Sequence, residues 1–113
     1  MLRRTTPVGR LARMGFADAH RAQLLVTEDL ALDPDGADAD LLTALAAAAD
    51  PDLALNAMAR MSFDAELRGA LRDDPGLRTR LTAVLGASVA LGEHLARHPD
   101  DWHVLRGDRK SVV

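Results

Sequence analysis

The sequence lacks cysteine, tyrosine and isoleucine, and its 113 residues include one tryptophan and two phenylalanines. Without cysteine, neither disulfide bonds nor thiolate metal sites can form, which favours a cytoplasmic protein. Without isoleucine and with few aromatic side chains, a β-sheet is hard to build, because strands favour β-branched and aromatic residues. No apolar run approaches the length needed to span a bilayer. We therefore expect a helical protein with no membrane partner.

An excess of positive charge is also missing. The formal net charge is −3 at pH 7, with 14 lysine and arginine residues against 17 aspartate and glutamate residues. A nucleic-acid-binding surface needs a basic face that displaces counterions from phosphates, so we expect no nucleic-acid partner. The one basic cluster, at positions 3, 4, 10 and 13, lies in a segment interrupted by Pro7 and Gly9. We expect this segment, residues 1–16, to be a flexible basic arm.

Alanine and leucine dominate the rest of the chain and recur at helical spacing. Two predicted helices begin with an Asp-Pro pair, Asp50–Pro51 and Asp74–Pro75. The aspartate can cap the helix, and the missing N–H of proline costs nothing at the first helical position. We therefore predict that residues 17–107 form one all-α domain, a small antiparallel helical bundle of about five to seven short helices. Met58 and Met61 lie at helical spacing and are interpreted as core filler.

The one cluster of potential metal ligands or acid–base groups lies near the C-terminal end and consists of Glu93, His94, His98, Asp101 and His103. His94 and His98 are four residues apart on one helical face, a spacing that can place two imidazoles on one zinc ion. Pro99, however, breaks the helix where a third ligand would be needed. The metal site is therefore the weaker interpretation of this pair.

A structural interpretation explains these residues better. His98 lies in the last turn of a helix, where it can interact with the helix dipole, and His94 is expected to be partly buried against a neighbouring helix. Trp102 is expected to close one end of the bundle. Gly92 costs up to about 1 kcal/mol relative to alanine inside a helix, which indicates close packing by another helix. With Pro99, these residues form a structural motif.

Neither a catalytic nor a cofactor-binding residue is assigned from the sequence. Ser88 lacks the second glycine and the preceding strand of a nucleophile elbow, and it is better interpreted as a helix cap. Gly86 and Gly92 do not fit a phosphate-binding loop.

Residues 85–105, LGASVALGEHLARHPDDWHVL, resemble the N-terminal helical region of glutamine synthetase adenylyltransferase. Weaker similarity at residues 10–18 and 41–55 extends the resemblance over most of residues 10–107. This family is a large bifunctional enzyme that adds AMP to glutamine synthetase and removes it by phosphorolysis. The resemblance implies ATP and Mg²⁺ as cofactors of the intact enzyme, with glutamine synthetase and the signal protein PII as partners.

The family's nucleotidyltransferase-like domains use a Gly-Ser motif with acidic residues that bind magnesium. That motif is missing here, since no Gly-Ser precedes Asp100 and Asp101. We therefore expect a fragment that is inactive alone and holds no cofactor. An independent all-α interaction module without catalytic activity is the alternative, and a small metal-dependent hydrolase or sensor that uses His94 and His98 is a third class. A fragment of a larger enzyme should leave apolar side chains near its C-terminal end unpacked.

The last six residues, DRKSVV at 108–113, differ from the rest of the chain. Lys110 is the only lysine. The same six residues are encoded by a common sequencing adapter. We interpret residues 108–113 as a non-native tail and expect the natural protein to continue past Gly107.

Overall fold

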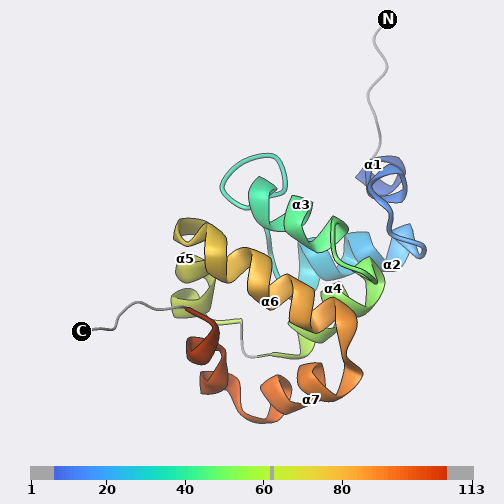
Figure 1. The fold of residues 1–113 in the computed structure, drawn as a ribbon. Helices are drawn as coiled ribbons and strands as arrows, with labels where there is room; N and C mark the ends of the chain where they lie inside the picture. Colours follow the sequence, from blue (N-terminus) through green and yellow to red (C-terminus); the bar gives the residue numbers. More distant parts are fainter. Residues whose placement is uncertain (1–6, 62, 107–113) are drawn as a thin grey trace, which may run out of the picture.

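The computed structural model describes residues 7–61 and 63–106, which form helices joined by short connections (Figure 1). In chain order the elements are α1 (Pro7–Met14), α2 (Ala19–Leu24), the π-helical turn η1 (Leu25–Asp29), α3 (Ala39–Ala46), α4 (Pro51–Arg60), α5 (Ala65–Asp73), α6 (Pro75–Ala87), α7 (Val89–Arg97) and the 3₁₀ helix η2 (Pro99–Arg106). The described residues contain no strand. The predicted all-α bundle is confirmed.

Helix α6 lies at the centre of this arrangement and contacts α3, α4, α5, α7 and η2 (Figure 1). Leu77, Leu81 and Leu85 on α6 are fully buried, and they face leucines and Met58 from the surrounding helices. Met61 is also buried, which confirms the interpretation of both methionines. The core is thus built from aliphatic side chains, as the composition requires.

The predicted helix caps are present. The carboxylates of Asp50 and Asp74 accept hydrogen bonds from the backbone N–H groups of Leu53 and Leu77, each at 3.1 Å, and a proline follows each aspartate. Ser88 caps α7 through a hydrogen bond from the N–H of Leu91. These local signals place the helix starts because each cap satisfies a backbone donor that the helix leaves free.

Two glycines allow close approach of helices. A Cβ atom on Gly92 would lie 3.1 Å from the Cβ of Ala57 on α4, which confirms the predicted close packing. A Cβ atom on Gly86 would lie 2.6 Å from the Cβ of Ala48. Helices α6 and α7 therefore pack against their neighbours at distances that a larger residue would prevent.

The N-terminal segment differs from the expected arm. We expected flexibility over residues 1–16, but residues 7–14 form α1, and Leu11 and Phe16 are buried. The stretch contains Arg10 and Arg13 of the basic cluster, yet its apolar residues gain more from burial than the segment gains by staying solvated. Residues 1–6 and 107–113, including the suspected tail, lie outside the described residues.

Candidate functional site

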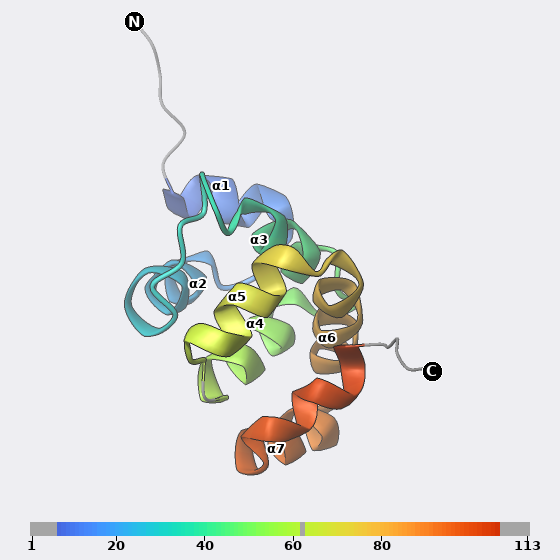
Figure 2. The same cartoon turned by 90° about the vertical axis from the view of Figure 1, so that its left-hand side faces the viewer.

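The histidine cluster lies in α7 and η2. These two elements form the end of the molecule opposite α1 (Figure 2). Nε2 of His94 lies 2.6 Å from Oδ2 of Asp101, and the ring centroids of His94 and His98 are 4.6 Å apart. The His94 side chain retains 47% of its accessible surface. The expectation that His94 is partly buried against a neighbouring helix is therefore wrong, because Asp101 pairs with the imidazole at the surface instead.

His103 does not join this cluster. Its Nε2 lies 3.5 Å from a carboxylate oxygen of Glu66 on α5, and its ring stacks on Trp102 at a centroid distance of 3.9 Å. Trp102 is 2% exposed and belongs to the core, as its interpretation as a plug predicts. The two histidine–carboxylate pairs thus tie η2 to two different helices.

No group of three or more histidine, aspartate or glutamate side chains in the described parts of the chain is placed to share a metal ion. The nitrogen of His94 that faces Asp101 is already paired, and His98 is the C-cap residue of α7, with Pro99 turning the chain immediately after it. These contacts favour the structural interpretation of the motif. The motif joins α7 to η2.

The structure contains a second polar cluster, which the sequence analysis did not predict. Asp38 precedes α3 and resembles a cap, but its carboxylate makes no capping bond. It is 1% exposed, and it accepts hydrogen bonds from Nε and Nη2 of Arg72 at 2.8 and 3.0 Å and from the N–H of Asp33 at 2.8 Å. Arg68 Nη1 lies 3.8 Å away. The cluster joins the segment before α3 to α5.

The pKa of Asp38 reflects two opposing effects. Burial alone would raise the pKa of this carboxyl, because a charged group loses its hydration. The hydrogen bonds from Arg72 and from the backbone of Asp33, together with the charges of Arg72 and Arg68, outweigh burial and lower the pKa below its ordinary value. Asp38 is therefore a charged structural group.

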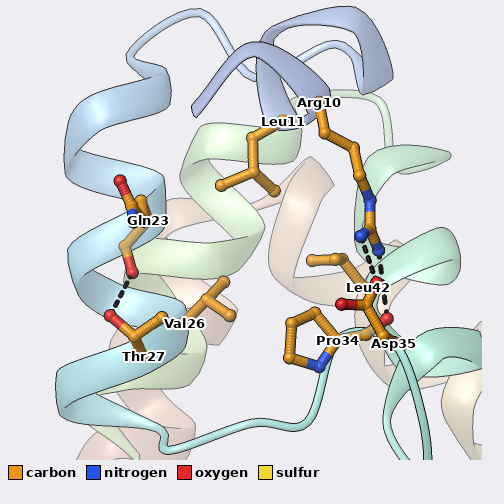
Figure 3. Close-up of a pocket in the computed structure, with 8 residues that line it drawn as sticks. All are labelled: Arg10, Leu11, Gln23, Val26, Thr27, Pro34, Asp35 and Leu42. Carbon is orange, nitrogen blue, oxygen red and sulfur yellow. Dashed lines mark hydrogen bonds and ion pairs between the residues drawn. The ribbon is translucent and has the colours of Figure 1, made fainter. Parts of the chain in front are cut away.

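A small cavity lies between α1, α2 and the segment before α3 (Figure 3). Its volume is about 180 Å³, and Arg10 reaches across its rim to bond Asp35 and, at 3.1 Å, the carbonyl of Pro34. Pockets for cofactors and similar ligands usually measure roughly 300–1,000 Å³. This cavity is too small for a nucleotide.

A larger, open hollow of about 530 Å³ lies between α2 and α4. At its edge Asp52 accepts the backbone N–H groups of Ala17 and Asp18 at 2.8 and 2.9 Å, and Arg21 donates to Asn56 at 2.9 Å. These bonds fix the start of α2 on α4.

None of the described helices is long and apolar enough to cross a membrane.

Sequence comparison finds relatives over nearly the whole chain. The bifunctional glutamine synthetase adenylyltransferase/adenylyl-removing enzyme of Streptomyces avermitilis is 46% identical over 110 residues, which cover 91% of this chain and 11% of that protein. The proteins of the same name from Mycobacterium leprae and Mycobacterium tuberculosis are 44% and 40% identical, and each match covers 86% of this chain and 10% of the relative. The chain thus spans about one tenth of the length of these relatives. No family model and no solved structure matches it.

Proposed function

Because the chain is homologous to a segment of the bifunctional glutamine synthetase adenylyltransferase/adenylyl-removing enzymes, we propose that it serves as the N-terminal helical scaffold of such an enzyme. The observation that carries this proposal is the 46% identity over 91% of the chain. At this level of identity the matched segment of the relative is expected to have the same helical arrangement.

In this proposal the intact enzyme transfers AMP from ATP to glutamine synthetase and removes it, in the cytoplasm, with Mg²⁺ in its catalytic domains and PII as its regulatory partner. The 113 residues alone are inactive. Two features support this division of roles. The chain has no Gly-Ser motif followed by paired carboxylates, and the cavity between α1, α2 and the segment before α3 is too small for a nucleotide.

The pattern of exposed apolar residues supports a fragment over an independent module. Val89, Leu91 and Val104, all near the C-terminal end of the described residues, are 54%, 48% and 82% exposed. A module complete in itself should cover such side chains.

A chimera tests the proposal directly. The matched segment of the Streptomyces avermitilis enzyme is replaced by this chain, and addition and removal of AMP on glutamine synthetase are measured with the chimera and with this chain alone. We expect the chimera to retain both activities and the chain alone to have neither. A folded chimera that lacks both activities, or an isolated chain that transfers AMP, would overturn the proposal.

A further inference from the structure

Three of the four large apolar side chains exposed among residues 7–61 and 63–106 lie in α7 and η2. Leu91 and His94 share one face of α7, because residues at i and i+3 align along a helix. The ring of His98, the C-cap residue, lies next to that of His94. On η2, Asp101 and Val104 are three residues apart and lie on one side of a 3₁₀ helix. The bond between His94 and Asp101 joins the two rows.

These five residues form one surface, which we call the α7–η2 stripe and define as Leu91, His94, His98, Asp101 and Val104. All five are exposed. The stripe has an apolar side chain at each end and a paired imidazole and carboxylate between them. Apolar side chains that are exposed on adjacent elements mark a candidate surface for contact with protein.

The stripe rests on a well-anchored support. Behind it, Leu95 and Trp102 are buried. Arg80 on α6 donates to the carbonyl of Leu105 at 2.6 Å, and His103 pairs with Glu66 on α5. Because η2 is attached to three helices, the stripe is already ordered before any partner arrives, and little conformational entropy is lost on binding.

We propose that the α7–η2 stripe is the surface on which this domain docks against the remainder of its own enzyme. This inference rests on the proposed function. The occupant is a segment of the polypeptide outside the matched tenth, one that presents apolar side chains to Leu91 and Val104 and a polar group to the His94–Asp101 pair.

The size of the stripe favours an intramolecular occupant. A stable complex between separate proteins usually involves about 20–30 residues on each side, far more than this stripe offers. A tethered segment needs less contact, because the linker raises its effective concentration. In the proposed enzyme about nine-tenths of the polypeptide lies outside the matched segment.

Hydrogen exchange on the chimera and on the isolated chain tests the docking surface. We expect backbone amides of residues 89–106 to exchange at least about tenfold more slowly in the chimera than in the isolated chain, because docking suppresses local opening. Amides of α2, on which Leu24 is 59% exposed, a value between those of Leu91 and Val104, should exchange at the same rate in both. Equal rates at residues 89–106 would overturn the inference.

Variants separate docking from simple stability. Leu91→Asp and Val104→Asp should abolish the extra protection in the chimera and lower its melting temperature, while the melting temperature of the isolated chain stays unchanged. Leu24→Asp is the matched control and should change neither protein. If Leu24→Asp reduces the protection as much as Val104→Asp does, the stripe is not the docking surface.

Two further readouts distinguish this inference from the proposed function. An active chimera without protection at residues 89–106 refutes the docking surface and leaves the proposed function standing. A folded, protected chimera without activity refutes the proposed function and supports docking. If protection in the isolated chain rises with protein concentration, the occupant is a second copy of the chain, and the inference is wrong.

Discussion

The carboxylate of Asp38, just before α3, accepts two hydrogen bonds from the guanidinium of Arg72 on α5, across 34 residues of sequence. Asp38 is buried, whereas Arg72 remains partly exposed. The pair therefore fixes the segment that leads into α3 without placing both charges in the interior. It explains why the pKa of Asp38 is lowered in spite of burial.

Stability should depend on pH through this carboxylate. An unfolded aspartate has a pKa of about 3.9, and the folded pKa of Asp38 lies lower. The contribution of Asp38 to stability is therefore fully present above the unfolded pKa and is lost as pH falls through the folded pKa. The free energy of unfolding should therefore decrease as pH falls below about 4. Urea unfolding at a series of pH values measures this free energy.

Asp38→Asn should flatten this pH dependence and, at neutral pH, lower the free energy of unfolding by about 2 kcal/mol, the scale of lost hydrogen bonds to a charged group. Asp40→Asn is the control. Asp40 is 82% exposed and lies 3.8 Å from Arg78, so its loss should cost less than about 1 kcal/mol. Equal effects of the two variants would contradict the role assigned to Asp38.

Gly86→Ala should destabilise the protein by roughly 1–3 kcal/mol, because the added Cβ would lie 2.6 Å from the Cβ of Ala48 and 3.3 Å from the carbonyl of Asp50. Gly69→Ala, inside α5, meets nothing within 4 Å and should stabilise by about 0.5–1 kcal/mol. Thermal unfolding followed by circular dichroism measures both. A stabilising Gly86→Ala would disprove the close contact between α6 and the residues around Ala48.

Trp102→Ala should cost about 3–5 kcal/mol, since the largest side chain of the chain would leave a cavity beneath η2. Trp102→Phe should cost less. Val104→Ala, two residues away at 82% exposure, should change stability by less than about 0.5 kcal/mol. Urea titrations of the four proteins, monitored by circular dichroism, test the order. A Trp102→Ala variant as stable as Val104→Ala would refute the core position of the indole.

Asp64→Ala should lower stability by about 1 kcal/mol, because the carboxylate of Asp64 accepts the N–H of Leu67 at 2.9 Å and caps α5. Asp73→Ala, in the last turn of the same helix, removes an acidic group from the negative end of the dipole and should be neutral or slightly stabilising. Chemical denaturation of both variants provides the comparison, and a larger loss for Asp73→Ala would contradict it.

Local signals in the sequence predicted the helix starts, because a cap such as Asp50 or Ser88 bonds a residue three positions away. The packing of Gly92 was predictable for a similar reason, since a glycine inside a helix is costly without a close neighbour. These features depend on residues close together in the chain, or on one residue's intrinsic cost.

The features that sequence reasoning missed depend on distant residues. Leu11 and Phe16 become core residues only when the rest of the bundle covers them, so the basic composition around them suggested an arm. The ion pair of Asp38 was not predicted, because Arg72 is 34 positions away. His94 was assigned to a helix contact, but its partner, Asp101, lies beyond the proline that ends α7.

The contacts of Arg68 limit which substitutions the protein tolerates at this position. Its guanidinium donates to the carbonyls of Leu30 and Ala31 at 2.7 and 3.1 Å, approaches Asp38, and lies 4.7 Å over the ring of Phe63. A lysine keeps the charge but has one compact ammonium group in place of the planar guanidinium, so it cannot contact all of these groups at once. At this position the exchange of one cation for another is a drastic change, and homologues with lysine here would need a differently shaped turn after η1.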